Sequence, residues 1–330
     1  MKNSTGGIYM KKLMNEKTNF VADMLEGIKV MDHSVEIISE NVVVRKNLKT
    51  NGVALVSGGG SGHEPAHAGF VAEGMLDAAV CGEVFTSPTP DKILEAIKHV
   101  ATEEGVLLII KNYAGDVMNF EMAQEMAEME GIQCQSVIVR DDISIENEQD
   151  RRGVAGTIFV HKYAGYLSDK GYHLTEIKDK VDAFIEKIRT IGMAIYPCLV
   201  PTTGQYGFDL DDEKMEIGIG IHGERGIYQE NIEPVDDIIK RLMNELEKEI
   251  SDKSLIVMIN GMGATPDSEL AVISKYFNDY ALNHQIEVKK YLIGNYMTAL
   301  DMQGFSITLV PYQEEYLKAF NAPTESKYFK

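Results

Sequence analysis

Histidine, lysine and aspartate side chains stand at three glycine-containing places in this chain, and these residue types can do acid–base and nucleophilic chemistry. His63 follows the glycine run SGGGSG, which begins at Ser57. Lys111 and Asp116 lie in KNYAGD, and His222 ends the stretch GIGIH. A neutral imidazole can attack a carbonyl carbon or accept a proton, and a carboxylate can act as a general base. The pattern therefore indicates a place where a small molecule could bind and react.

The stretch MEIGIGIHGERG, residues 215–226, has the period of a β-strand. Isoleucines alternate with two glycines and His222, so Gly218 and Gly220 fall on the same face as the imidazole. Since glycine has no side chain, the pattern predicts room beside His222 for a small guest. The alternative is that the glycines mark a bulge or a close backbone approach.

The first glycine run follows the apolar residues 53–56, which predict a buried strand ending in a loop, a usual ligand position in an open α/β sheet. A phosphate-binding P-loop is excluded because His63, Glu64 and Pro65 stand where Gly-Lys-Ser/Thr is required. A dinucleotide fingerprint fails because His63 replaces its third glycine. We expect the backbone to close on something small and His63 to bond it or move a proton. The alternative is that His63 begins a helix and satisfies a loop carbonyl.

The KNYAGD segment follows a second apolar run, residues 106–110, which also predicts a buried strand. Lys111 and Asp116 then lie at the carboxyl end of that strand, where the ligands of such sheets gather. Asp116 has a second interpretation, since an aspartate before a helix commonly caps it. The helix predicted over residues 120–129 is rich in methionine, which we expect to lie in the core.

The elements that position these side chains predict an α/β protein with two α/β domains. In the first, strands alternate with helices, which favours a largely parallel sheet flanked by helices. The second is smaller, with a mixed sheet, and carries His222. We expect residues 1–9 to be a flexible extension, residues 10–190 the first domain and residues 191–330 the second, with the boundary near Ile191. Helices are predicted at 19–30, 175–190, 235–250 and 268–283, and strands at 42–44, 136–139, 193–200, 255–260, 287–293 and 305–310.

The composition bounds the function classes. The 330 residues carry a net charge of −19, which argues against nucleic acid or an anionic membrane as a partner. The three cysteines, Cys81, Cys134 and Cys198, lack a metal-type spacing, so we expect no metal site and a reducing, cytoplasmic setting. No apolar run reaches transmembrane length.

Taken together, SGGGSGHEP at Ser57, IIKNYAGD at Ile109 and GIGIHGE at Gly218 resemble the dihydroxyacetone-binding subunit of dihydroxyacetone kinases. Further motifs carry the resemblance over nearly the whole chain in the family order: GEVFTSPTPDKI, RRGVAGT, GATPDSEL and LDMQGFSITL. The family frequently has Ala-Ala-Gly-Lys-Pro where residues 202–206 stand here. It usually has proline where Arg225 stands and threonine where Ala114 stands, which bears on the exact ketose and the docking face.

The resemblance implies roles for the singled-out residues. His222 would bond covalently, through a ring nitrogen, to the ketone carbon of dihydroxyacetone. The segment from Gly60 through Ser61 and Gly62 to His63 would bind the ketose together with Lys111 and Asp116. His63 and Asp116 are then the candidates for the base that takes the hydroxyl proton.

The resemblance also implies partners. No cofactor is expected on this chain, because ADP or ATP with Mg²⁺ would be held by a separate all-helical kinase subunit. In phosphotransferase-linked systems a phosphohistidine-carrying protein recharges that nucleotide. The subunit itself is expected to be a homodimer.

Two alternatives from the same resemblance stay open. Some paralogues bind dihydroxyacetone but act as transcriptional co-activators, and these lose the threonine–serine loop and the glycine of KNYxGD. This chain keeps Thr86, Ser87 and Gly115, which favours the enzyme. The other alternative is a kinase subunit for a related ketose such as erythrulose. Arg225 could meet the donor's phosphates or an acidic patch on the partner, or it could be a solvated loop residue.

Overall fold

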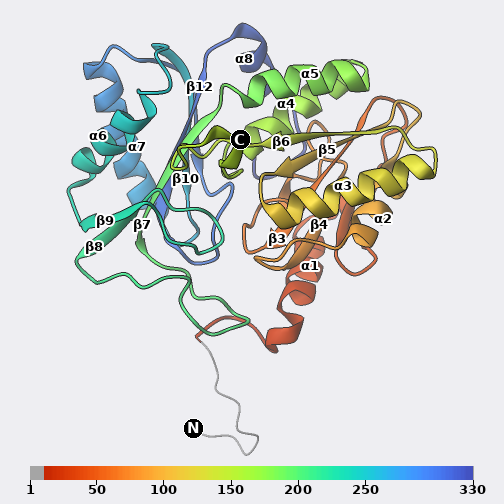
Figure 1. Cartoon of the computed structure of the whole chain (residues 1–330), viewed down its shortest axis with the longest axis horizontal. Coiled ribbons are helices and arrows are strands. Elements are labelled where there is room, and N and C mark those ends of the chain that lie inside the picture. Colours follow the sequence, from red (N-terminus) through yellow and green to blue (C-terminus); the bar gives the residue numbers. More distant parts are fainter. Residues whose placement is uncertain (1–10, 330) are drawn as a thin grey trace, which may run out of the picture.

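Two six-stranded sheets lie beside one another in the computed structural model, which describes residues 11–329 (Figure 1). The expectation for residues 1–9 falls outside the described range. The α-helices are α1 (Phe20–Met31), α2 (Pro90–Val100), α3 (Ala114–Met129), α4 (Thr157–Asp169), α5 (Leu174–Ile185), α6 (Val235–Leu246), α7 (Asp267–Asn283) and α8 (Glu314–Asn321). Short 3-10 helices are η1 (Lys17–Asn19), η2 (Ala68–Phe70) and η3 (Glu148–Asp150).

The first sheet has the order β1-β2-β4-β3-β5-β6. Its strands are β1 (Val35–Ile38), β2 (Val42–Arg45), β3 (Ala54–Ser61), β4 (Ala78–Val84), β5 (Val106–Lys111) and β6 (Cys134–Val139). Strands β4, β3, β5 and β6 are parallel, whereas β1 and β2 add an antiparallel edge. The predicted largely parallel sheet is therefore confirmed.

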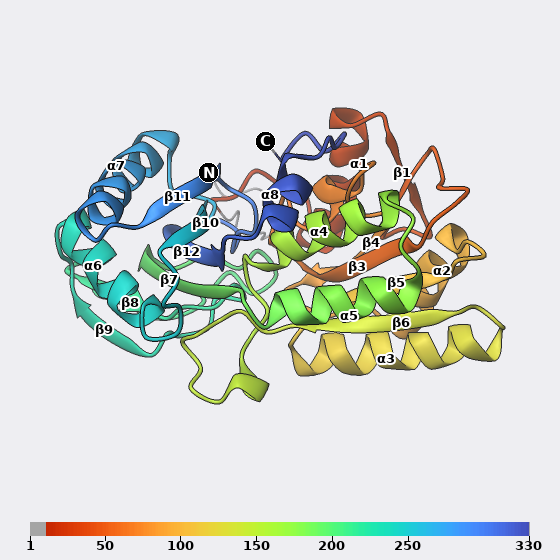
Figure 2. The ribbon, with the colours of Figure 1, turned by 90° about the horizontal axis from the view of Figure 1, so that it is seen from above.

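Helices cover both faces of the first sheet because its central strands are apolar on both sides. On β5, Leu108 and Ile110 pack in the cluster formed with α2 and α3. Leu107 and Ile109 point the other way, into the cluster formed with α4 and α5. Figure 2 shows the sheet between α3 on one side and α4 and α5 on the other.

The second sheet is mixed, as predicted, with the order β11-β10-β12-β7-β8-β9. Its strands are β7 (Arg189–Tyr196), β8 (Lys214–Ile217), β9 (Tyr228–Asn231), β10 (Ser254–Gly261), β11 (Glu287–Gly294) and β12 (Gln303–Pro311). Only the β10–β11 pair is parallel. Helices α6 and α7 cover the outer face (Figure 2). The inner face packs into the same core cluster as the helices of the first half, through Ile256, Met258 and Val310.

The strands of the two sheets separate between β6 and β7, but the chain crosses back at its C-terminal end. Ser326 Oγ donates to Gly69 O at 2.8 Å, and Lys162 Nζ on α4 donates to Pro323 O at 3.2 Å. The last residues therefore lie on the first half. The division into domains at Ile191 stays a proposal.

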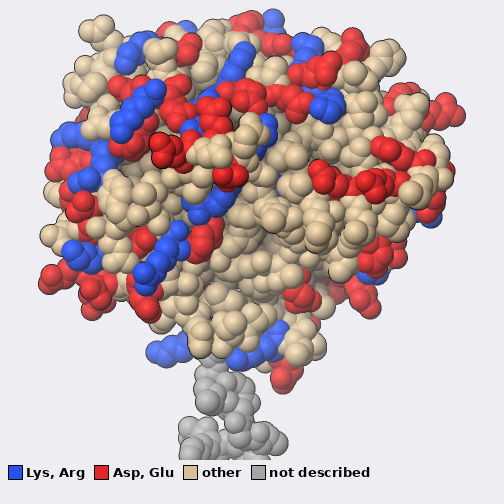
Figure 3. Space-filling view, in the orientation of Figure 1, with Lys and Arg blue, Asp and Glu red and all other residues tan. Residues whose placement is uncertain are grey.

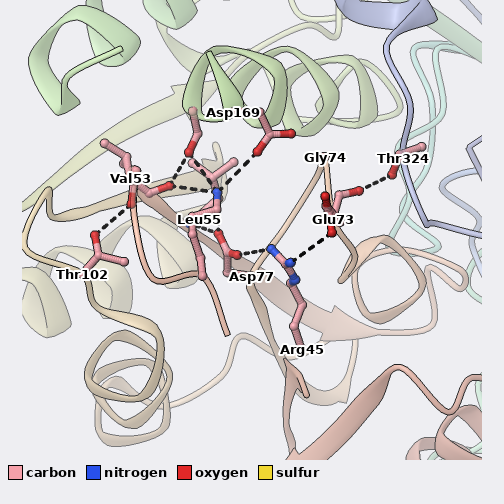
Figure 4. Close-up of polar contacts among 12 residues, drawn as sticks. Arg45, Val53, Leu55, Glu73, Gly74, Asp77, Thr102, Asp169 and Thr324 are labelled. Carbon is pink, nitrogen blue, oxygen red and sulfur yellow. Dashed lines mark hydrogen bonds and ion pairs between the residues drawn. The ribbon is translucent and has the colours of Figure 1, made fainter. Parts of the chain in front are cut away.

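A buried ion network ties the antiparallel edge of the first sheet to its centre (Figure 4). The Asp77 carboxylate accepts hydrogen bonds from Arg45 Nη1 and from the backbone N–H of Leu55, each at 2.8 Å. Lys49 Nζ lies 3.4 Å from the same carboxylate. The Asp77 side chain is only 2% exposed, and a carboxylate this buried needs such hydrogen bonds and positive partners to offset its loss of solvation.

Some predicted elements differ from the observed ones. Strand β3 continues through the glycines to Ser61, because strand pairing with β4 extends along them. Helix α5 ends at Ile185, so Thr190 lies on β7 instead of a helix. Helix α3 begins at Ala114, and its N-cap is Tyr113.

The methionines of the helix predicted over residues 120–129 were expected to lie in the core, and this is wrong for Met122 and Met129. Met118, Met122 and Met129 are 59%, 48% and 85% exposed, respectively. The buried face of this helix is formed by Phe120 and by alanines. In Figure 3 acidic side chains lie among uncharged ones over α3, whose exposed glutamates are Glu121, Glu125 and Glu128. Among residues 11–329, no helix is long and apolar enough to cross a membrane.

Candidate active site

Two histidines from different halves of the molecule meet at the site. His63 lies two residues after Ser61, where the glycine-rich strand β3 ends, and His222 lies in the loop between β8 and β9. Their Nε2 atoms are 3.2 Å apart, and the ring planes are nearly perpendicular, at 84°. Residues 159 positions apart in the sequence are therefore within hydrogen-bond distance.

The hydrogen bonds of His63 assign the tautomers of both rings. His63 Nδ1 lies 2.8 Å from the carbonyl oxygen of Thr298, which can only accept, so Nδ1 carries the proton. Burial, the His222 ring and Lys111 hold the pKa of His63 well below its ordinary value, so the ring is neutral and its Nε2 accepts. The proton between the rings therefore lies on His222.

His222 is also neutral over the whole physiological range. Burial, Lys111 and Arg152 lower the pKa of the His222 imidazole to about 3. A ring that stays uncharged keeps a lone pair available for an electrophile, which is what a nucleophilic imidazole needs. The His63 ring bonds the carbonyl of Thr298, as the alternative interpretation expected, although no helix begins at this residue. That His63 bonds a guest or moves a proton stays a proposal.

Lys111 and Asp116 form an ion pair beside the glycine strand. Lys111 Nζ lies 2.9 Å from Asp116 Oδ2, and both side chains are at most 3% exposed. Lys111 also donates to the carbonyl oxygen of Gly58 at 3.2 Å. The expectation that Asp116 caps its helix is wrong, since the carboxylate lies inside the first turn and binds Lys111. Asp116 is thus free of a capping role.

Aromatic rings close the space around His222. The Tyr113 ring centroid lies 4.2 Å from that of His222, and Phe85 lies 5.5 Å away, both edge-on. Phe85 also stacks on His63 at 5.5 Å. The Tyr113 hydroxyl is buried and has no hydrogen-bond partner. This apolar surround removes water from the imidazoles and keeps them neutral.

The glycines before His222 do not make room for a guest, which corrects the prediction from the strand pattern. Strand β8 ends at Ile217, so the alternation does not continue to His222. A Cβ at Gly218 would lie 2.5 Å from Ile227, and one at Gly220 would overlap Glu224. The alternative interpretation, a close approach of neighbouring groups, is the one the structure supports.

Three residues of the glycine run that were expected to bind substrate, Gly60, Ser61 and Gly62, make contacts within the protein. Ser61 Oγ donates to Gly82 O at 2.7 Å, and the N–H of Gly62 donates to the Glu64 carboxylate at 3.0 Å. A Cβ at Gly60 would lie 2.6 Å from the backbone nitrogen of Thr86. The glycines therefore let the loop after β4 approach the strand, which places Phe85 against both histidines.

Comparison with known proteins identifies the family. Residues 26–328 match the Dak1 domain. The chain belongs to the Dak1 domain family. The chain is 45% identical over 315 residues to a Listeria innocua protein named PTS-dependent dihydroxyacetone kinase 1, dihydroxyacetone-binding subunit DhaK, covering 93% of this chain and 95% of the relative. A Lactococcus lactis protein named PTS-dependent dihydroxyacetone kinase, dihydroxyacetone-binding subunit DhaK, is 46% identical over 323 residues, covering 94% and 96%.

Solved structures share the Dak1 fold. The dihydroxyacetone kinase of Citrobacter freundii superposes with a TM-score of 0.91 at 36% identity, over 96% of this chain and 60% of the longer kinase. A protein described as the dihydroxyacetone kinase operon co-activator Dha-DhaQ superposes with a TM-score of 0.89 at 35% identity, over 92% and 97%. The same fold therefore occurs in a kinase and in a co-activator.

Two glutamates of this Dak1 domain were missed by the sequence reasoning. Glu64 accepts from the N–H of Gly62, and Glu224 accepts from the N–H of His222 at 2.7 Å. Each carboxylate thus fixes the backbone two residues before it, next to a site histidine. The signal was present in the sequence, because glutamate follows each histidine closely in GHEP and HGE.

Other ionisable groups of the Dak1 domain lie near the site with different roles. His67 is buried against His161 and Ser57. Arg225 is exposed and lines a surface hollow with Asp209 and Asp211, a poor setting for phosphates. Within the described residues, no group of three His, Cys, Asp or Glu side chains could hold a metal ion.

Proposed function

We propose that this chain is the dihydroxyacetone-binding subunit of a multi-subunit dihydroxyacetone kinase and holds the ketose as a hemiaminal on His222. The observation that carries the proposal is the contact between the neutral rings of His63 and His222 at 3.2 Å, beside the Lys111–Asp116 pair. The relatives named as dihydroxyacetone-binding subunits support it.

The covalent step balances with the groups at hand. A bond forms between a ring nitrogen of His222 and the ketone carbon, while the imidazole N–H proton ends on the carbonyl oxygen. Since His63 Nε2 faces the protonated nitrogen, it is placed to take that proton and return it to the oxygen. No water leaves, so the adduct contains the whole ketose.

Covalent binding explains how so small a substrate could be selected. A triose offers few atoms for contacts, and non-covalent discrimination between close analogues is weak. Glycerol has no carbonyl and cannot form the hemiaminal. The Lys111–Asp116 pair could then bind a terminal hydroxyl, with Asp116 or His63 accepting its proton as phosphate is transferred.

The phosphoryl donor in this proposal is ADP or ATP with Mg²⁺ on a separate helical subunit, which a phosphohistidine-carrying protein recharges. The relatives' names, which include PTS-dependent kinases, support this arrangement. A Citrobacter freundii kinase solved with AMP-PNP and Mg²⁺ is longer than this chain, which covers 60% of it. We further propose that the subunit acts as a homodimer.

The co-activator is the second candidate because a structure with that description shares 35% identity over 97% of its length. Gly115 and Ser87, which the family resemblance associates with the kinases, lie against each other here. A Cβ at Gly115 would lie 2.8 Å from Ser87 Oγ, so a larger residue would displace the threonine–serine loop. This chain keeps both Gly115 and the threonine–serine loop that packs against it, which favours the kinase.

Intact-mass measurement tests the covalent site. Wild-type protein mixed with dihydroxyacetone should gain the mass of one whole ketose per chain, whereas glycerol should add nothing. His222→Ala should show no adduct. Thermal unfolding of that variant provides the control, because a folded variant without adduct isolates the role of the ring. Tight calorimetric binding to the wild type with an unchanged mass under non-denaturing conditions would rule out the hemiaminal.

A further inference from the structure

Arg152 joins the two halves of the molecule at the loop that carries His222. It lies between η3 and α4 in the first half, and its side chain is 14% exposed. Arg152 Nη2 donates to the carbonyl oxygen of Gly218 at 2.9 Å, and Nη1 donates to Glu224 Oε1 at 3.0 Å. These two acceptors stand four residues before and two residues after His222, so one guanidinium holds both sides of the histidine.

The other end of this arrangement is anchored in the first half. Arg152 Nε donates to Asp142 Oδ2 at 2.7 Å, and Nη2 donates to Ser144 Oγ at 2.8 Å. Asp142 follows β6 and is 1% exposed. Since a planar guanidinium presents its donors in a fixed fork, four such contacts leave Arg152 little freedom to move.

Glu224 links Arg152 to His222 by hydrogen bonds to both residues. One oxygen, Oε1, accepts from Arg152, and the other, Oε2, accepts from the backbone N–H of His222 at 2.7 Å. Gly220 is required between them, since a Cβ there would overlap the Glu224 carboxylate. The distance between His222 in the second half and His63 in the first is thereby set by contacts that cross between the halves.

We infer that Arg152 is a positioning residue, which acts through Glu224 and Gly218 to hold His222 against His63 in the reactive geometry. The inference rests on the proposed function, because it names a residue on which adduct formation depends. Arg152 itself does not touch the reacting atoms. The N–H groups of its guanidinium are hydrogen-bonded to Asp142, Glu224, Ser144 and Gly218. It is therefore distinct from the binding residues expected from the sequence.

The neighbouring Arg151 provides a matched control. Its side chain is 5% exposed and pairs with Glu249 through both terminal nitrogens, at 2.5 and 2.9 Å. It also donates to Ile145 O, and its side-chain partners among residues 11–329 all lie outside the His222 loop. Both arginines thus form buried ion pairs, but only Arg152 holds the loop of His222.

Arg152→Gln should slow adduct formation with dihydroxyacetone by about 10²-fold, the effect of a displacement near 1 Å at a reacting group. Arg151→Gln should lose stability but form the adduct within twofold of the wild-type rate. Glu224→Gln should give an intermediate loss, because an amide has one acceptor oxygen for two donors. If Arg152→Gln fails to fold, Glu224→Gln still tests whether the contacts between Arg152, Glu224 and His222 set the rate of adduct formation.

The pH profile separates positioning from mere stability. The ionisable groups that influence or contact His222 are His63, Lys111, Tyr113, Arg152 and Glu224. Losing the Arg152 charge removes one cause of the lowered His222 pKa, so adduct formation in Arg152→Gln should fail at a higher pH than in the wild type. Arg151→Gln should keep the wild-type profile.

Ring-nitrogen NMR signals of His63 and His222 distinguish failure of this inference from failure of the proposed function. They should change in Arg152→Gln but not in Arg151→Gln, even without ketose. If the wild type formed no adduct, the proposed function would fail while these signals still tested the positioning. Equal signals and equal adduct rates in the two arginine variants would overturn the inference.

Discussion

At the scale of single residues, burial and a positive neighbourhood decide the chemistry of the histidine pair. An exposed imidazole has a pKa near 6.5 and is partly charged in neutral solution. Burial, Lys111 and Arg152 lower the pKa of His222 to about 3. The ring therefore keeps a free lone pair in neutral solution, which the proposed attack on the ketone requires.

The stability of the protein should depend on pH through His222. Between pH 6.5 and 3 the unfolded chain binds this proton and the folded chain does not, so stability falls as pH falls. One such proton corresponds to about 1.4 kcal/mol per pH unit. His222→Ala should thus reduce the slope of unfolding free energy against pH by that amount near pH 5, as measured by urea unfolding. The same slope in both proteins would contradict the lowered pKa.

At the scale of elements, α3 combines a site residue at its start with a solvent-facing stripe along its length. Asp116 in the first turn is buried against Lys111, whereas Met118, Met122 and Met129 are exposed. The helix is apolar on more than one face, so the spacing of its methionines did not distinguish core from surface. Packing against β5 and α2 selects Phe120 as the buried anchor.

Two substitutions on α3 should differ strongly in their effects. Phe120 is fully buried, so Phe120→Ala should lower the free energy of unfolding by about 3–5 kcal/mol. Met122→Ala, two residues along the same helix, should change it by less than about 0.5 kcal/mol, because the side chain is 48% exposed. Urea unfolding measures both. A large loss in Met122→Ala would mean that this face is covered in solution.

At the scale of the whole molecule, the site is assembled where the halves meet. His63, Lys111 and Asp116 come from the end of the first sheet, and His222 comes from a loop of the second. The inner face of the second sheet shares a core cluster with α4 and α8.

The isolated chain should transfer no phosphate. The sequence has no P-loop lysine and no kinase-type glycine loop, and its net charge of −19 repels nucleotides. Purified protein with dihydroxyacetone, ATP and Mg²⁺ should give no ketose phosphate, and activity should appear when a helical nucleotide-bearing subunit is added. Turnover by the chain alone would require a nucleotide site on it.

The elements and the chemistry-bearing residue types could be predicted from the sequence alone. Apolar runs such as residues 106–110 predict buried strands because both faces of a central strand are covered. The carboxyl ends of parallel strands meet at one edge, which already placed Lys111 near the glycine run. The stretch 215–226 and the family motifs both singled out His222, but its distance from His63 along the chain gave no local indication of contact.

The roles of Gly218 and Gly220 and of the Asp116 carboxylate could be decided only from the tertiary structure. The pattern around Gly218 and Gly220 fits both a strand face and a close approach. The distinction depends on how the chain turns after His222, which brings Glu224 and Ile227 back onto the glycines, and on Arg152 from a distant segment. The capping role of Asp116 likewise failed because Lys111 lies within reach. Local periodicity reflects one segment's own geometry, whereas burial, pKa and the distance between two histidines depend on contacts between segments far apart in the chain.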